Sequence, residues 1–203
     1  IDVTDESSVR DAVAVAAEHS GRIDVMANLA GVFRPPAPII ETSLKDWNKT
    51  IAVNLTATLL CMKHTLLQMI SQGGGGAIVN TASSLGVSMN RVNLGPYVAS
   101  KAGVHVLTQT AAIEAAQYGI RVNSVSPGTT ATSMSLRAGE TDADRAARVQ
   151  GSIPLGRGTS SSSLARTITA CWPRCRTLAA VSPGEPRVPD RTFEDPFQPD
   201  QRL

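Results

Sequence analysis

Residues 77–81 read Ala-Ile-Val-Asn-Thr, a short apolar run of strand character that lies between two long segments of helical character. On its amino-terminal side, apolar residues recur at helical spacing over 43–72. On its carboxyl-terminal side, a second helical pattern extends over 96–118, with proline in its first turn and glycine after its end. The sequence therefore places one buried strand between two helices.

The same alternation continues in both directions along the chain. A helical stripe over 7–19 precedes an apolar strand at 23–27, and a third strand at 121–125 ends before Pro127 and Gly128. Strands that are joined through helices form parallel sheets with right-handed crossovers. The sequence therefore predicts an α/β fold in which the loops after the three strands line one ligand crevice.

The composition excludes several classes of protein. The chain has 203 residues, of which 42% are hydrophobic and 18% are charged, and its formal net charge is +2. This balance argues against wholesale disorder and against nucleic-acid binding through bulk charge. No apolar run approaches the roughly 20 residues of a membrane span, and three scattered cysteines suit neither a disulfide framework nor a zinc site. We therefore expect a cytoplasmic protein without nucleic-acid, membrane or metal partners.

The character of the sequence changes toward its end. Four serines stand in a row at 160–163, and half of the twelve prolines fall between 173 and 199. Proline interrupts both helices and strands, so we expect only a short helix at 164–170 and poor order in the rest. The chain therefore divides into a domain over 1–157 and an Arg/Ser/Pro-rich tail over 158–203.

Tyr97 and Lys101 stand four residues apart within the second long helix, and Ser84 lies thirteen residues before Tyr97. Residues at this spacing share one helix face, so the ammonium can approach the phenol. A nearby cation lowers the phenol pKa from its usual value of about 10. Tyr97 is then an acid/base for a substrate oxygen that Ser84 holds. Taken alone, this spacing is also typical of a half-buried tyrosine beside an unrelated surface lysine.

Three further segments extend this group of residues. Asn28-Leu29-Ala30-Gly31 follows the first expected strand, where small residues permit the close approach of a flat ligand. Asn54 lies inside the long helix, where asparagine is unfavourable unless its amide makes a specific bond; backbone or water can also satisfy it. Residues 127–132 supply backbone donors and hydroxyls that suit an amide or a phosphate, although such a string is also an ordinary turn.

The order of these motifs resembles the short-chain dehydrogenase/reductase family over roughly residues 1–157. The family carries an Asn-Asn-Ala-Gly string, a catalytic Asn, a Ser and Tyr-x-x-x-Lys, which match Asn28-Leu29-Ala30-Gly31, Asn54, Ser84, and Tyr97 with Lys101. Its Pro-Gly-x-x-x-Thr string matches Pro127, Gly128 and Thr132, and its Asp-Val pair matches Asp2 and Val3. Leu29 departs from the second Asn of the string. The resemblance implies a Rossmann-like, doubly wound parallel sheet with helices on both faces.

The resemblance also implies a hydride transfer between a nicotinamide cofactor, NAD or NADP, and the carbon of a secondary alcohol or ketone. In that reaction Tyr97 is the acid/base and Ser84 holds the substrate oxygen. Lys101 lowers the Tyr97 pKa and holds the nicotinamide ribose, while Asn54 keeps a water in a proton relay. The implied cofactor contacts are Asp2 and Val3 at the adenine, Asn28, Ala30 and Gly31 beside the cofactor, and Pro127, Gly128 and Thr132 near the nicotinamide carboxamide.

Two parts of the family pattern are missing from this sequence. The family begins with a strand, a Gly-rich loop and a helix that hold the pyrophosphate, and this sequence begins after them. The glycines at 73–76 lie between a helix and a strand, which is the wrong order for that loop. The family's last strand is replaced by the tail. We therefore expect an incomplete sheet, without the first βαβαβ part and the last strand, in which the 23–27 strand is an exposed apolar edge.

Two functional hypotheses remain open at this point. The first is an NAD(P)-dependent oxidoreductase that acts on a small-molecule alcohol or ketone. The second is a catalytically inactive remnant, or an interaction scaffold, that does not bind cofactor. The resemblance also implies a homodimer formed through the helices over 43–72 and 96–118.

Overall fold

The computed structural model describes residues 1–137, 139–151, 153 and 157–174. The elements follow one another in the order α1 (Glu6–Ser20), β1 (Val25–Asn28), η1 (Ile39–Glu41), α2 (Leu44–Ile51), η2 (Ala52–Thr56), α3 (Ala57–Gln72), β2 (Gly76–Thr81), α4 (Ser84–Val87), α5 (Gly95–Ala115), η3 (Ala116–Tyr118), β3 (Ile120–Val125), η4 (Ser133–Ser135), α6 (Asp142–Gln150) and α7 (Ser161–Arg174). The three strands lie where the sequence predicts them, within two residues at each end.

The strands form a parallel sheet in the order β1-β2-β3. Asn28 of β1 pairs with Asn80 of β2, and Thr81 of β2 pairs with Val125 of β3. In the described part of the chain β1 is an edge strand, as the sequence predicts, and its Ala27 is exposed. Because the strands are parallel, their carboxyl ends and the loops that follow them emerge at one edge of the sheet.

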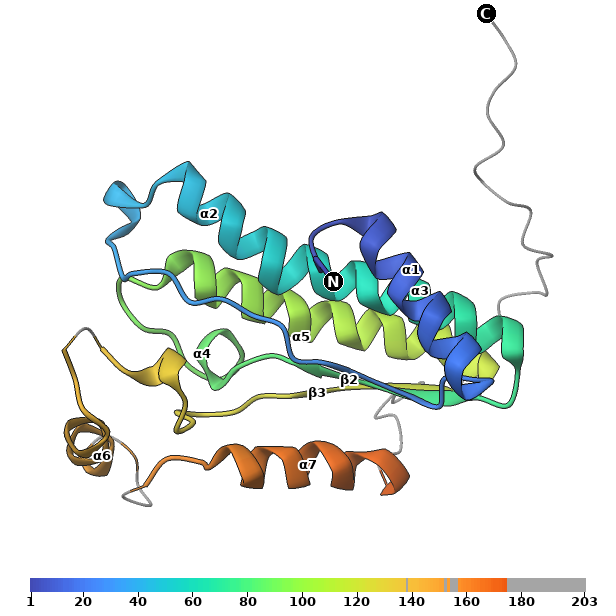
Figure 1. Cartoon of the computed structure of the whole chain (residues 1–203). Helices are drawn as coiled ribbons and strands as arrows, with labels where there is room; N and C mark the ends of the chain where they lie inside the picture. Colours follow the sequence, from blue (N-terminus) through green and yellow to red (C-terminus); the bar gives the residue numbers. More distant parts are fainter. Residues whose placement is uncertain (138, 152, 154–156, 175–203) are drawn as a thin grey trace, which may run out of the picture.

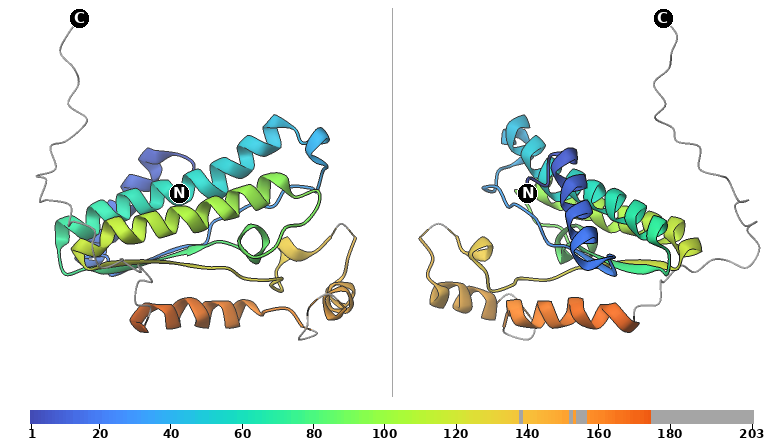
Figure 2. Two further views of the ribbon diagram at one scale, coloured as in Figure 1. Left: turned by 180° about the vertical axis from the view of Figure 1, so that it is seen from behind. Right: turned by 45° about the vertical axis from the view of Figure 1, so that its right-hand side comes forward.

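Helices cover both faces of this sheet. Helices α1, α3 and α5 lie on one face, and α7 lies on the other, where it contacts β2 (Figures 1 and 2). The predicted two-faced layering of a partial Rossmann-like fold is therefore confirmed.

The core lies between the sheet and helices α3 and α5. Its most buried side chains include Met62 and Met69 of α3, with Ile78 and Ile120 of the sheet, each at most 2% exposed. Among the described residues, no aromatic side chain belongs to this cluster, which agrees with the low aromatic content of the sequence. Full burial of such an aliphatic side chain contributes about 1.5–3 kcal/mol, so this layer holds α3 and α5 on the sheet.

The long helix predicted over 43–72 begins as expected but is not regular. Ser43 caps it by accepting a hydrogen bond from the Asp46 backbone N–H at 3.0 Å. A π-helical segment, η2, interrupts it over Ala52–Thr56, and hydrophobic periodicity gives no signal of this irregularity.

The search for apolar runs in the sequence did not identify the high mean hydropathy of this helix. The helical run Leu44–Gln72 is long and apolar enough to pass a test for a membrane span, with a mean hydropathy of 1.2 in its most apolar stretch. A core helix passes the same test. Burial of 44% of this stretch, with Met62 and Met69 in the core described above, accounts for part of its apolar composition.

The carboxyl-terminal part is more helical than the sequence indicates. Helix α7 extends over Ser161–Arg174, beyond the short helix expected at 164–170, and Thr130 forms a bridge with Thr159. Helix α6 was not predicted. The remainder of the predicted tail, 175–203, lies outside the described residues, and the domain boundary at 157 stays a prediction.

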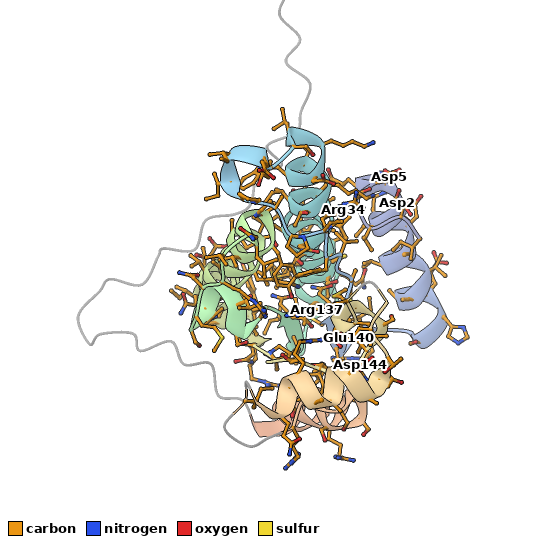
Figure 3. The ribbon with its side chains drawn as sticks, turned by 90° about the vertical axis from the view of Figure 1, so that its left-hand side faces the viewer. Asp2, Asp5, Arg34, Arg137, Glu140 and Asp144 are labelled. Atoms are coloured by element: carbon orange, nitrogen blue, oxygen red, sulfur yellow. The ribbon has the colours of Figure 1, made fainter. Side chains whose placement is uncertain are left out.

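An ion pair ties α6 to the loop before it. Arg148 donates two hydrogen bonds to the Glu140 carboxylate, from Nε at 2.6 Å and Nη2 at 2.7 Å, and the Arg137 backbone N–H donates a third at 2.9 Å. Figure 3 shows Arg137, Glu140 and Asp144 together at the start of α6. These bonds, first of all the one from Arg148, lower the pKa of Glu140 to about 2 from its usual 4.5.

Glu140→Gln should lower the thermal midpoint near neutral pH by a few degrees. A carboxyl whose pKa is lower in the folded state stabilises that state. The contribution is complete at pH values above 4.5, the pKa of the carboxyl in the unfolded chain, and it is lost as pH falls toward about 2, the pKa in the folded state. The difference in the free energy of unfolding between parent and variant should therefore shrink from pH 7 to pH 3, and urea unfolding at each pH measures it. Glu18→Gln, on an exposed position of α1, is the matched control, and a constant difference at all pH values would contradict the assignment.

Candidate active site

Tyr97 lies in the first turn of α5, directly after the proline that starts this helix. Its hydroxyl is hydrogen-bonded to the side chain of Ser83. The Phe33 ring, from the loop after β1, packs edge-on against the Tyr97 ring with 5.1 Å between the centroids and 67° between the planes. Tyr97 is therefore held from two sides, by the loops that follow β1 and β2.

Lys101 lies on the same face of α5, as the sequence predicts. Its Nζ is 6.0 Å from the centroid of the Tyr97 ring and donates a 2.7 Å hydrogen bond to the Thr81 carbonyl at the end of β2. The residue is only 5% exposed, and burial lowers the pKa of its ammonium to about 8. The amine thus remains mostly protonated at neutral pH but is close to titrating.

The expected lowering of the Tyr97 pKa is not found in this structure. Burial raises the pKa of Tyr97, and the hydrogen bond with Ser83 opposes that rise. The reason is geometric, because the Lys101 ammonium lies over the ring and bonds to Thr81, away from direct contact with the phenol oxygen. Desolvation of the phenolate therefore outweighs the hydrogen bond with Ser83, the interaction that lowers the Tyr97 pKa.

The serine beside the tyrosine is Ser83, whereas the sequence analysis selected Ser84. Ser83 is 6% exposed, caps α4 by accepting from the Leu85 backbone N–H at 3.2 Å, and reaches Tyr97. Ser84 contributes its backbone N–H to the Pro127 carbonyl at 3.0 Å. The interaction with the Tyr97 hydroxyl comes from Ser83, and a spacing of about thirteen residues to Tyr97 does not distinguish two adjacent serines.

Asn54 joins the loop after β1 to the first turn of α5. Its amide oxygen accepts from the Val32 N–H at 2.7 Å, and its amide nitrogen donates to the Val32 carbonyl at 3.0 Å and to Ser100 Oγ at 3.1 Å. Ser100 Oγ in turn donates to the Tyr97 carbonyl at 2.7 Å. Because both residues are fully buried, they fix the position of Tyr97. Sequence reasoning missed Ser100, and the water relay through Asn54 stays a prediction.

Gly31 and Thr81 lie near Lys101, Gly31 by its distance to the ammonium and Thr81 by the bond to its carbonyl. A Cβ on Gly31 would lie 3.4 Å from Asn54 Oδ1 and 3.7 Å from Lys101 Nζ, so only a glycine leaves this space open. Thr81 Oγ1 is buried without a hydrogen-bond partner among the described residues. A buried ammonium, a free hydroxyl and open space at a glycine fit the hydroxyl groups of a ribose.

The Asn28 side chain makes a structural bond within the sheet, and the cofactor contact that the resemblance implies for this residue stays a prediction. It is 9% exposed and donates from Nδ2 to Asn80 Oδ1 at 2.8 Å. Asn80, which is fully buried, donates to Thr108 Oγ1 at 2.9 Å, and Thr108 donates to the Val104 carbonyl at 2.6 Å. The Asn28 side chain is therefore turned into the sheet, where this polar row connects β1, β2 and α5, and the sequence analysis missed Asn80 and Thr108.

The other predicted cofactor residues lie on the loops around this group. Asp2 is labelled in Figure 3 near the start of α1, and its carboxylate accepts hydrogen bonds from the backbone and side chain of Thr4. Val3 is half-buried, and Ala30 is exposed in the loop after β1. Pro127 lies against α4 through its bond to Ser84, and a Cβ on Gly128 would meet nothing within 4 Å among the described residues. Thr132 caps η4, and its carbonyl accepts from Arg145 at 3.0 Å. Their roles stay predictions.

Two pockets lie beside the loops that the sequence predicts to line one crevice. One pocket, beside Tyr97, lies between the segment 34–50 and the segment 93–97. The other lies between the loop after β3 and helix α6, and Thr129 and Arg145 line it. No three His, Cys, Asp or Glu side chains gather as a metal site within the described ranges.

Gly86 permits α4 to approach α5. Its φ is +95°, and a Cβ there would overlap the Val98 carbonyl oxygen and lie 3.1 Å from the Ala102 nitrogen. Gly86→Ala should therefore destabilise the fold by about 2–4 kcal/mol, combining a left-handed backbone with a backbone clash. Urea unfolding measures this loss. Gly151→Ala, with open space around it and a negative φ of −81°, should change stability by less than about 1 kcal/mol; an equal effect of both would contradict the argument.

The chain is similar to characterised oxidoreductases. A family model described as enoyl-(acyl carrier protein) reductase matches residues 1–171. A cis-4-hydroxycyclohexanecarboxylate dehydrogenase from Sinomonas cyclohexanicum is 44% identical over 156 residues, which are 77% of this chain and 61% of that protein. The short chain dehydrogenase/reductase astE of Aspergillus oryzae is 39% identical over 151 residues, which are 72% of this chain and 58% of that protein.

Two further comparisons concern a diol dehydrogenase and a solved structure. A 2,5-dichloro-2,5-cyclohexadiene-1,4-diol dehydrogenase from Sphingobium indicum is 37% identical over 77% of this chain and 62% of its own length. Carveol dehydrogenase from Mycobacterium avium, in complex with NAD, superposes with a TM-score of 0.77 at 28% identity, covering 83% of this chain and 65% of that one. The chain thus spans about three fifths of the length of the curated relatives that it matches.

Proposed function

This chain belongs to the short-chain dehydrogenase/reductase family, and on that premise we propose that it carries the catalytic part of an NAD(P)-dependent oxidoreductase. The reaction is a hydride transfer between nicotinamide and the carbon of a secondary alcohol or ketone. One observation carries the proposal: the Tyr97 hydroxyl is bonded to Ser83 while the buried Lys101 ammonium lies over the same ring.

The chain's own residues account for the proton that the reaction moves. Oxidation of an alcohol releases one proton from its hydroxyl, and Tyr97 Oη is the group placed to take it. Ser83 Oγ holds the same substrate oxygen by a hydrogen bond as its charge develops. The nicotinamide, when bound, takes up the hydride from the carbinol carbon and supplies it in reverse.

The cofactor is NAD or NADP, and the unused polar groups beside Lys101 support its placement there. Lys101 Nζ would donate to a hydroxyl of the nicotinamide ribose, the Thr81 hydroxyl would be a second partner for it, and Gly31 would border the ribose. Contacts of Asp2 and Val3 with the adenine, and of Pro127, Gly128 and Thr132 with the carboxamide, belong to the same proposal. So does a proton relay through a water near Asn54.

The names of the relatives support a ring alcohol as the substrate. The Sinomonas cyclohexanicum relative acts on a hydroxycyclohexanecarboxylate and the Sphingobium indicum relative on a cyclohexadienediol. Both names describe a six-membered ring with a hydroxyl and a second oxygen function opposite it. We take a secondary alcohol on a six-membered ring as the substrate class.

A homodimer through α2–α3 and α5 is part of the proposal. Exposed apolar side chains on these helices support it: Leu59 and Leu67 on α3 are 45% and 50% exposed, and Val106 and Ile113 on α5 are 59% and 64% exposed.

Titration calorimetry with NADH and NADPH, combined with nicotinamide absorbance during turnover of cyclohexanol, tests the function. We expect a saturable heat with one or both nucleotides and an absorbance change that depends on the alcohol. If neither appears with this chain, the hypothesis of a remnant that does not bind cofactor replaces the proposal.

A further inference from the structure

The pocket beside Tyr97 contains three charged side chains. Arg34 comes from the loop after β1, Glu41 from η1 and Asp46 from α2, and the remaining lining residues are neutral. Their formal charges sum to −1. A ligand that carries its own negative charge is therefore repelled by this pocket, whereas a neutral polar ligand is not.

Arg34 has hydrogen-bond capacity that its ion pair does not use. Its Nε donates to Asp46 Oδ1 at 2.8 Å, and Asp46 Oδ2 accepts from Ser43 Oγ at 2.7 Å. The hydrogen bond from Ser43, followed by that from Arg34, lowers the pKa of Asp46 and keeps it ionised at neutral pH. A guanidinium has five N–H donors, so the pair with Asp46 orients Arg34 and leaves its terminal Nη groups available to a ligand.

The two walls of the pocket are joined to each other. The Ala37 backbone N–H donates to the Asn93 carbonyl at 2.9 Å, and Thr42 Oγ1 donates to the Pro38 carbonyl at 3.0 Å. Asn93 has a φ of +66°, a left-handed conformation that costs energy in a residue other than glycine. The loop that carries Arg34 is thus fixed beside the start of the helix that carries Tyr97.

We propose that this pocket receives the side of a ring alcohol opposite its carbinol carbon, and that Arg34 donates a hydrogen bond to a neutral oxygen substituent there. This inference rests on the proposed function and specifies its substrate as a diol or a hydroxyketone. Because Asp46 is already paired with Arg34, Glu41 is the carboxylate that disfavours a second negative charge in this pocket, so the specificity differs from that named for the Sinomonas cyclohexanicum relative.

The test compares three alcohols and four proteins. The alcohols are cyclohexanol, cyclohexane-1,4-diol and 4-hydroxycyclohexanecarboxylate, and the proteins are the parent, Arg34→Gln, Glu41→Gln and the control Arg10→Gln. Arg10 is an exposed arginine on α1 that pairs with Asp11. The parent should have a kcat/KM for the diol about tenfold above that for the carboxylate. Arg34→Gln should bring the ratio of kcat/KM for the diol to kcat/KM for cyclohexanol close to one. Glu41→Gln should reduce the difference in kcat/KM between the diol and the carboxylate.

The control Arg10→Gln should have the same ratios of kcat/KM among the three alcohols as the parent. A parent that prefers the carboxylate, or an Arg34→Gln ratio equal to the parent's, overturns the proposal. Saturation-transfer NMR of the same ligands separates this failure from failure of the proposed function. If no alcohol is turned over but the diol binds and Arg34→Gln abolishes that binding, the pocket assignment stands and the enzymatic proposal fails. If the diol does not bind the parent, the pocket assignment fails.

Discussion

Replacing Tyr97 by phenylalanine should lower kcat for alcohol oxidation about a thousandfold, because the variant keeps the ring but has no group to take the substrate proton. General acid–base catalysis contributes about 10²–10⁴-fold. The ring contact with Phe33 at 5.1 Å and the buried position of Lys101 do not involve the lost hydroxyl. The fold should therefore persist, and steady-state nicotinamide absorbance should measure a loss of chemistry.

The pH profile of the parent gives a second measure of Tyr97. Because burial raises the pKa of this phenol, the phenolate that accepts the proton is scarce at neutral pH, and oxidation should still increase on the alkaline side of neutrality. Tyr118→Phe, at an exposed tyrosine after α5, is the control and should leave the rate and the profile unchanged. Equal turnover by Tyr97→Phe and the parent would remove Tyr97 from the mechanism.

Ser83→Ala should lower kcat about a hundredfold, whereas Ser84→Ala should change it by less than about threefold. Removal of one positioned donor to a developing oxyanion costs about 10²–10³ in kcat. Ser83 is the serine whose side chain reaches the Tyr97 hydroxyl, whereas the bonds of Ser84 are made by its backbone, with Pro127, Ser88 and Met89. The adjacent serine is thus a control with the same chemistry and nearly the same position in the chain.

Both variants remove one hydroxyl from the same turn, so circular dichroism and thermal unfolding should first show that they fold alike. Single-turnover kinetics then separates chemistry from product release. If Ser84→Ala shows the large loss and Ser83→Ala the small one, the assignment from the sequence spacing was correct, and the bond between Ser83 and Tyr97 has no catalytic role.

The fold was predictable because its signals are local and repeated. Each strand is a short apolar run, and each intervening helix has an apolar stripe, so the parallel order follows from general rules of connection. Asn54 was also detectable, since an asparagine inside an apolar helix needs a specific partner, and its bonds to Val32 and Ser100 supply one.

The site was less predictable because its details depend on directions and distances. The spacing between Tyr97 and Lys101 places them on one face, but the sign of the Tyr97 pKa shift depends on burial and on the bond from Lys101 to Thr81. The choice between Ser83 and Ser84 depends on one turn after β2. The Asn28 side chain points into the sheet because Asn28 of β1 pairs with Asn80 of β2. This register between two strands cannot be inferred from a sequence pattern.

The polar row of Asn28, Asn80 and Thr108 restricts how this protein can change over evolutionary time. An apolar residue at Asn80 alone would leave the Asn28 amide without the acceptor that Asn80 Oδ1 provides, which costs about 1–3 kcal/mol, while Thr108 would lose a donor but keep its own bond to the Val104 carbonyl. Replacing all three together removes the need for any of them. Relatives should therefore retain these positions or exchange them jointly, and a lineage that passes through single replacements should do so only with compensating stability elsewhere.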